Sequence, residues 1–128
     1  MNIKLTQEAL SEVAALKDPC LDAVCKYIID SKSEDAELYV FSKPSSPFGR
    51  VILATCLSVR HLSLMADDIE VLIKQNFWNK KGKPVITQGT KDDGWVAIDI
   101  LQHDLVLHFF LQSARQNFKL EDLYKTIL

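Results

Sequence analysis

Apolar and polar residues alternate along the chain with two periods, and these periods predict the elements of the fold. The clearest element is an amphipathic helix, because apolar residues recur at intervals of three and four. These residues are Val59, Leu62, Met65, Ala66, Ile69, Leu72 and Ile73. Ser58 stands where the N-cap of this helix belongs, and we expect the helix to end near Asn76.

Three more segments have helical signals. Asp18 followed by Pro19 predicts a helix start, since a capping side chain precedes a proline whose missing N–H costs nothing at the first position. That helix should run to about Ser31. A shorter helix is expected to begin with Thr6 as its cap, and a last helix is expected over residues 120–127.

Strands are predicted where β-forming residues cluster or alternate. The segments are Glu37–Ser42, Arg50–Cys56, Val85–Thr87, Trp95–Leu101 and Leu105–Leu111. The second is almost entirely apolar, which is typical of a strand buried on both faces. The last two should pair as a hairpin, whereas Lys43–Pro47 contains two prolines and is expected to be a loop. The order predicts an α/β fold, a mixed β-sheet flanked by helices.

The predicted hairpin has one apolar face and one mixed face. The mixed face carries Trp95, Asp99, Asp104 and His108 among apolar neighbours. A tryptophan in such a setting is typical of an interface anchor, because it buries a large area while its indole N–H keeps a partner. Spacing supports a second interpretation equally well, in which Trp95 packs under a helix and His108 is a hydrogen-bonded core histidine.

Composition and charge narrow the class of protein. The chain has 128 residues, which suits one domain, and it is 48% apolar and 25% charged, which disfavours disordered, collagen-like and coiled-coil proteins. Its net charge is -2, so the field of the whole molecule should not attract it to nucleic acid or to an anionic membrane. A partner must therefore be bound through a local patch.

Apolar stretches, the amino terminus and the cysteines together predict where in the cell the protein is located. The longest apolar stretches are far shorter than the ~20 residues that span a bilayer. The amino terminus has neither an Arg-rich face nor an apolar signal core, and the three cysteines are an odd number, which fits a reducing compartment. We therefore expect a cytoplasmic protein without a membrane segment.

A search for catalytic chemistry gives negative expectations. The four glycines are scattered, so no phosphate-binding loop is indicated, and the cysteines and histidines do not have metal-ligand spacing. Cys56 beside His61 or His108 could be a nucleophile, but a buried apolar thiol is the favoured interpretation. No pair of carboxylates lies at i and i+2 on one strand. We expect no enzyme activity, metal or cofactor.

A set of short motifs in one order resembles the ribosomal silencing factor (Iojap) family, from about Cys20 to Tyr124. The amino-terminal part is Glu34-Asp35, Ser45-Ser46, Ala54-Thr55 with Ser58 and Arg60, and Ala66-Asp67. The carboxy-terminal part is Trp95-Val96 with Asp99, Leu105-Val106-Leu107-His108 with Phe110, then Arg115, Phe118, Leu120-Glu121, Leu123 and Tyr124.

This resemblance implies a nucleotidyltransferase-like fold without the catalytic acids, in a protein that binds rather than catalyses. Family members dock on the large ribosomal subunit through its protein number fourteen, at the face toward the small subunit, and block subunit joining when nutrients are scarce. Trp95 and Asp99 match the family's docking residues, and Asp104 and His108 are nearby candidates. Ser58, Arg60, Asp67 and Arg115 match family motifs of unassigned role.

Three departures from the family pattern stand out. Cys56 replaces a glycine, Gly49-Arg50 replaces an Asp-Tyr pair, and the hairpin turn from Leu101 to Asp104 is two residues longer. The first residues have no family counterpart, so we expect a helical extension over 1–19 and one domain over 20–128. The alternatives to a ribosome-binding silencer are a small nucleotidyltransferase and a homodimeric scaffold.

Overall fold

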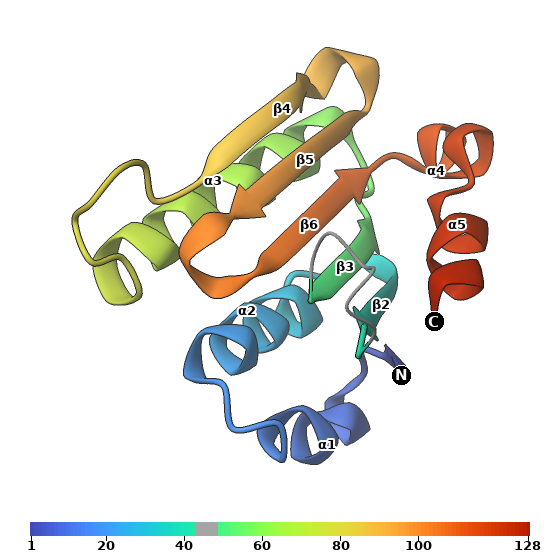
Figure 1. Ribbon diagram of the computed structural model, residues 1–128. Coiled ribbons are helices and arrows are strands. Elements are labelled where there is room, and N and C mark those ends of the chain that lie inside the picture. The colour runs from blue at the N-terminus through green and yellow to red at the C-terminus, as the bar shows by residue number, and fades with distance from the viewer. Residues whose placement is uncertain (43–48) are drawn as a thin grey trace.

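The computed structural model has a six-stranded mixed sheet with helices on both faces, as Figure 1 shows. It describes residues 1–42 and 49–128. The strand order is β1-β2-β3-β6-β5-β4, in which β3 and β6 are parallel and the other neighbours are antiparallel. The predicted α/β class is confirmed. The expected loop at Lys43–Pro47 and the motif serines Ser45 and Ser46 lie outside the described residues.

The strands and helices follow the predicted order with two additions. The strands are β1 (Asn2–Lys4), β2 (Glu34–Val40), β3 (Arg50–Thr55), β4 (Ile86–Thr90), β5 (Trp95–Ile100) and β6 (Leu105–Phe110). The helices are α1 (Leu10–Ala14), α2 (Pro19–Asp30), α3 (Val59–Asn76), α4 (Gln112–Phe118) and α5 (Leu120–Ile127), with 3-10 turns η1 (Gln7–Ala9), η2 (Lys91–Asp93) and η3 (Leu101–His103). None of the described helices is long and apolar enough to cross a membrane.

Both predicted caps of the central helices are confirmed. The Asp18 carboxylate accepts a hydrogen bond from the backbone N–H of Leu21 at 3.1 Å. The Ser58 hydroxyl accepts one from the N–H of His61 at 3.0 Å. Each bond satisfies one of the backbone donors that a helix leaves unpaired at its start, and this fixes where α2 and α3 begin.

One local expectation was wrong, and two elements were not predicted. Thr6 makes no side-chain cap, and a 3-10 turn precedes a helix of only five residues. The strand β1 was not predicted, although it adds an edge to the sheet and its Ile3 is buried in the core. The helix α4 was also not predicted. Whether 1–19 is an extension to a domain over 20–128 stays a prediction.

The main core lies between the sheet and the helices α2 and α3. The apolar face of the hairpin points into it, as predicted, and the buried run of β3 has both faces covered because Val51 to Ala54 are fully inaccessible. A second, smaller cluster covers part of the opposite face, where Tyr124 of α5 and Ala114 of α4 pack on Tyr39 and Phe110. We call this opposite face the outer face of the sheet.

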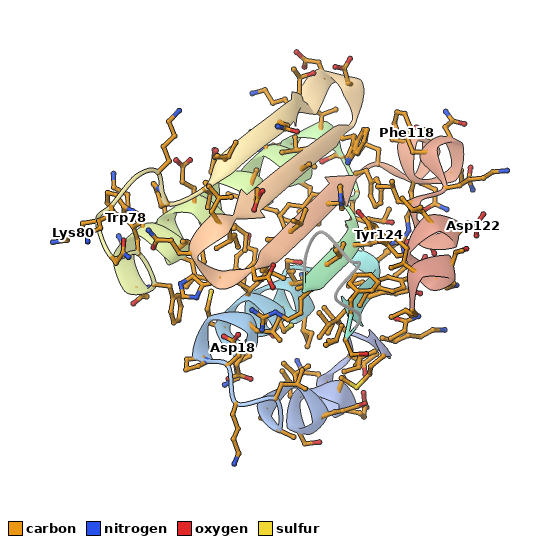
Figure 2. The ribbon with its side chains drawn as sticks, viewed as in Figure 1. Asp18, Trp78, Lys80, Phe118, Asp122 and Tyr124 are labelled. Carbon is orange, nitrogen blue, oxygen red and sulfur yellow. The ribbon has the colours of Figure 1, made fainter. Side chains whose placement is uncertain are left out.

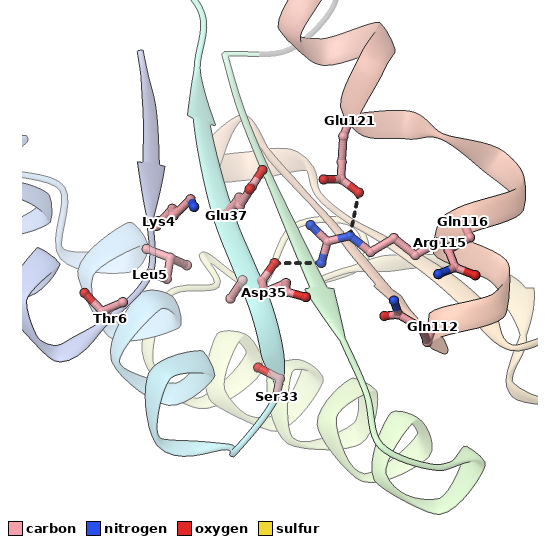
Figure 3. A pocket seen from close by; sticks show the side chains of 11 residues that line it. Lys4, Leu5, Thr6, Ser33, Asp35, Glu37, Gln112, Arg115, Gln116 and Glu121 are labelled. Atoms are coloured by element: carbon pink, nitrogen blue, oxygen red, sulfur yellow. Dashed lines mark hydrogen bonds and ion pairs between the residues drawn. The ribbon is translucent and has the colours of Figure 1, made fainter.

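The Arg115 side chain attaches the C-terminal helices to the sheet. It is 5% exposed, and its Nε donates to Glu121 Oε1 at 2.7 Å. Its Nη1 donates to the Asp35 carbonyl oxygen at 2.6 Å and to Thr55 Oγ1 at 2.9 Å, and its guanidinium lies over the Phe110 ring. Figure 3 shows Arg115 reaching from α4 toward β2, with Glu121 above it. One buried cation therefore connects α4, α5, β2 and β3.

We expect the substitution Arg115→Met to lower the free energy of unfolding by about 3 kcal/mol or more, because it removes one member of a buried hydrogen-bonded ion pair. Urea unfolding followed by circular dichroism measures the effect. The control is Lys26→Met, which removes an exposed lysine paired with Asp22 and should cost less than about 1 kcal/mol. Equal losses in the two variants would contradict the role given to Arg115.

Candidate functional site

The outer face of β4, β5 and β6 is arranged in three cross-strand rows. Side chains directly opposite one another in a sheet point to the same side. The rows are Thr90, Trp95 and Phe110; Gln88, Ala97 and His108; and Ile86, Asp99 and Val106. The structure therefore brings Trp95, Asp99 and His108 to one side of the hairpin, as the alternation of the sequence predicted.

Burial divides this surface into a covered half and an open half. Phe110 is inaccessible and His108 is 7% exposed, because α4 and α5 lie over the β6 side of the sheet. Trp95, Ala97, Asp99 and Val106 are half-buried, and every residue of β4 is exposed. We call the open part the hairpin face and define it as Ile86, Gln88, Trp95, Ala97, Asp99 and Val106.

Trp95 lies at the boundary between the two halves and is held in place on both sides. Its ring packs against Phe118 of α4, with 4.5 Å between ring centroids. Its indole N–H donates to His108 Nδ1 at 3.1 Å, and His108 Nε2 contacts the Tyr124 hydroxyl at 3.0 Å. Figure 2 shows Phe118 and Tyr124 on the two C-terminal helices. The indole is thus fixed in one orientation while part of it still faces solvent.

The same contacts assign His108 its protonation state. Burial lowers the pKa of the His108 imidazole to about 4. Because Nδ1 accepts the indole N–H, the neutral ring must carry its proton on Nε2, which donates to Tyr124. His108 is therefore a hydrogen-bonded core histidine, which is one of the two interpretations that its spacing in the sequence supported. It would affect a partner only by holding Trp95 in place.

Asp99 is the charged group of the hairpin face. It is half-buried among Ile86, Ala97 and Val106, and its carboxylate forms no hydrogen bond or ion pair with any described residue. Burial raises the pKa of the Asp99 carboxyl, and the nearby Asp104 carboxylate raises it further. A partly desolvated carboxylate without a cation is an unfavourable arrangement that a cation from a partner would relieve.

The longer hairpin turn is joined to the start of β3. Asp104 adopts a left-handed conformation at φ 50° and is exposed. Its Oδ1 accepts the backbone N–H of Gly49 at 2.9 Å, and a Cβ at Gly49 would lie 2.3 Å from Asp104 Oδ2. Arg50 donates to the carbonyl oxygen of His103 and pairs with Asp18. Two of the departures from the family pattern therefore contact each other directly.

The motif residues of unassigned role lie elsewhere. Ser58 caps α3, and Arg60 and Asp67 are exposed on that helix, which covers the inner face of the sheet. Arg115 is structural, as described above. The third departure, Cys56, is buried with its Sγ 3.5 Å from Met65 Sδ. These residues do not join the hairpin face.

Sequence reasoning missed part of the site. Gln88 belongs to the hairpin face because β4 pairs with Trp95 to Asp99, whereas β4 was predicted to end at Thr87. Phe118 was missed as a support of Trp95 because α4 was not predicted. The alternation of Ile86, Thr87 and Gln88 was the available signal for the longer strand.

Concave sites on the described surface offer less chemistry. One pocket of about 410 Å³ lies between β2 and the C-terminal helices, and its wall includes Arg115, Glu121 and Asp35, which are already bonded to one another. Within residues 1–42 and 49–128, no three His, Cys, Asp or Glu side chains cluster in a way that could hold a metal ion. The hairpin face is therefore the candidate site.

Comparison with known proteins agrees with this fold. The family described as "ribosomal silencing factor during starvation" (RsfS) matches residues 14–127. The chain belongs to the ribosomal silencing factor family, whose members are ribosome-associated regulators. A search of curated proteins finds no match.

Two crystal structures have a similar fold. A protein from Chromobacterium violaceum aligns over 92% of this chain and 85% of its own, with a TM-score of 0.67 and 24% identity. A protein from Bacillus halodurans aligns over 81% of this chain and 91% of its own, with a TM-score of 0.63 and 21% identity. At these identities the likeness concerns the fold alone. The implied likeness to nucleotidyltransferases stays a prediction.

We expect acid to destabilise the protein through His108. The unfolded imidazole has an ordinary pKa near 6.5, so between pH 6.5 and about 4 the unfolded state binds a proton that the folded state does not. The free energy of unfolding should then fall by about 2 to 3 kcal/mol more in the parent protein than in His108→Gln as pH drops from about 7 to 4.5. Urea unfolding at both pH values measures this difference, and parallel curves would contradict it.

Proposed function

We propose that the protein represses translation by docking on the large ribosomal subunit through the hairpin face and so blocking subunit joining when nutrients are limiting. The contact we propose is protein number fourteen of that subunit, at the surface that meets the small subunit. Family membership supports the ribosome as the target. We also propose that the protein acts in the cytoplasm and as a binding protein rather than an enzyme.

The single observation that carries the proposal is Asp99. A partly desolvated carboxylate that has no ionic partner among the described residues, beside the apolar side chains of Ile86, Ala97 and Val106, suits a protein partner that supplies a cation. Ribosomal proteins are commonly basic, and one Lys or Arg placed against Asp99 would both pair this charge and fix the orientation of docking. Asp104, exposed at the turn, adds negative potential beside it.

Trp95 is suited to supply most of the affinity. Anchoring residues of interfaces are often tryptophans whose surroundings hold them in the bound orientation before the partner arrives. Phe118 and His108 hold the Trp95 indole in this way. Ile86, Ala97 and Val106 around it provide the apolar surface that excludes water from the contact.

The deciding experiment is co-sedimentation of the protein with isolated large subunits, followed by a subunit-joining assay. We expect the protein to sediment with the large subunit and to reduce the yield of joined ribosomes. Protein that remains in the supernatant while joining proceeds unhindered would refute the proposal.

The substitution Trp95→Ala should weaken binding to the large subunit by about 2 kcal/mol or more, as loss of an interface anchor does. Leu123→Ala is the matched control, because Leu123 is an exposed apolar residue of α5 outside the hairpin face. Circular dichroism checks that both variants fold. Unchanged affinity in a folded Trp95→Ala variant would remove Trp95 from the docking site.

The substitution Asp99→Asn tests the ionic part of the contact without disturbing the support of Trp95. A docked cation favours the ionised carboxylate, so binding by the parent should weaken as pH falls into the range of the raised Asp99 pKa. Asp99→Asn should bind about tenfold more weakly at neutral pH and lose this dependence. Asp92→Asn, an exposed carboxylate at the other end of β5, serves as control and should behave like the parent.

The homodimeric scaffold is a different use of the same surface. If two copies bury their hairpin faces against each other, light scattering will give twice the mass of the 14.5 kDa chain. A dimer that dissociates in the presence of large subunits is compatible with the proposal, whereas a dimer that excludes them is not.

A further inference from the structure

The lysines are distributed unevenly along the chain, although the net charge of the whole chain is close to zero. Residues 71–91 contain five lysines and no Asp or Glu. The remaining residues carry ten basic against seventeen acidic side chains. A protein with a formal charge of -2 therefore has one strongly basic segment in an acidic molecule.

Three of these lysines lie on one connection. Residues 77–85, which we call the basic connection, join α3 to β4 and contain Lys80, Lys81 and Lys83, all exposed. Figure 2 shows Lys80 and Trp78 on this connection, at the left of the view, beyond the end of the sheet. Within the described part of the chain, none of these lysines forms an ion pair. Their charges are therefore available to a partner.

The backbone of the basic connection is held by hydrogen bonds from the hairpin turn between β5 and β6. The Gln102 side-chain amide donates to Asn79 Oδ1 at 2.6 Å and to the Lys81 carbonyl oxygen at 2.8 Å, and its Oε1 accepts the Asn79 N–H at 3.1 Å. The Trp78 indole N–H donates to the same Lys81 carbonyl at 3.3 Å, and His103 Nε2 donates to the Phe77 carbonyl at 2.6 Å. The two residues Gln102 and His103 belong to the lengthened hairpin turn.

This arrangement differs from an ordinary solvated lysine loop. Fixing the backbone in advance lowers the entropy that a partner must remove on binding, while the lysine side chains stay unpaired. The connection also leads directly into Ile86, which lies in the same cross-strand row as Asp99. A partner on the hairpin face and a partner on the basic connection would therefore be neighbours.

We propose that the basic connection binds RNA, through phosphate contacts from Lys80, Lys81 and Lys83 with Trp78 beside them as a stacking surface for a base. Clustered lysines with an interleaved aromatic ring are the chemistry that holds RNA without reading its sequence. An anionic membrane fits less well, because the basic connection itself, residues 77–85, contains no exposed large apolar side chain for insertion.

The choice of RNA rests on the proposed function, since a large ribosomal subunit presents RNA phosphates beside its surface proteins. Docking would then have two parts: the acidic and apolar hairpin face meets a basic protein, and the basic connection meets adjacent ribosomal RNA. The opposite charges of the two surfaces would reject the reversed orientation, because each would face a like charge.

The test compares two triple variants that lose the same charge. Lys80→Gln, Lys81→Gln and Lys83→Gln together alter the basic connection but keep its backbone bonds. Lys17→Gln, Lys32→Gln and Lys125→Gln together remove three exposed lysines from other parts of the chain. Both variants have a formal charge of about -5, so long-range effects of net charge cancel in the comparison.

Binding to a single-stranded uridine RNA of about 20 nucleotides is measured by fluorescence anisotropy between about 50 and 200 mM salt. We expect the variant of the basic connection to lose affinity at least tenfold at the lowest salt. Its slope of log affinity against log salt should be shallower by about 2, since each lysine contributes about 0.7 on a single strand. The control triple variant should keep the parent slope.

The anisotropy measurement with RNA tests this inference, whereas co-sedimentation with large subunits tests the proposed function. RNA binding that depends on the basic connection upholds the inference even if the parent fails to sediment with large subunits. Absence of RNA binding by the parent, or equal slopes for the two triple variants, overturns it. Binding to phosphatidylglycerol vesicles that depends on these three lysines, without RNA binding, overturns it in favour of a membrane.

Discussion

The buried guanidinium of Arg115 is the interaction on which the shape of the functional surface depends. It reaches residues that are 80 and 60 positions away in the sequence, and it takes the charge partner Glu121 from the helix that follows its own. A buried cation is stable only when its N–H groups are paired, so this geometry fixes α4 and α5 over one part of the sheet. What those helices leave uncovered is the hairpin face.

The edge of the area that α4 and α5 cover explains why the candidate residues differ in burial and in hydrogen bonding. His108 lies under α5 and is neutral, and Trp95 lies at the edge and is held by His108 and Phe118. Asp99 lies beyond the edge, and its carboxylate has no ionic partner within residues 1–42 and 49–128. An unpaired, half-buried carboxylate costs stability in the free protein. Groups that cost stability in this way are expected at functional sites, where residues are selected for binding rather than for folding.

The sequence predicted the parts of the fold that local rules control. The cap at Ser58, the start at Asp18 and the alternation along β5 and β6 each follow from a few neighbouring residues, and each is present in the structure. The strand β1 has only three residues and no pattern to detect. The segment Gln112–Phe118 has no apolar period, and the contacts that hold α4 on the sheet come from Arg115 and residues far away in the sequence. The site was predicted as a set of residues on one face, but its division into covered and open halves was not.

Two of the three departures from the resembled family pattern, Gly49-Arg50 and the hairpin turn, form one connected structure. A side chain at Gly49 would collide with Asp104, and Arg50 donates a hydrogen bond to the carbonyl oxygen of His103. Gln102 and His103 in turn form hydrogen bonds with the backbone of the basic connection. The two extra residues of the turn thus join the start of β3 on one side to residues 77–81 on the other. Through these contacts the hairpin turn fixes the backbone of the basic connection beside the hairpin face, so that the two surfaces adjoin.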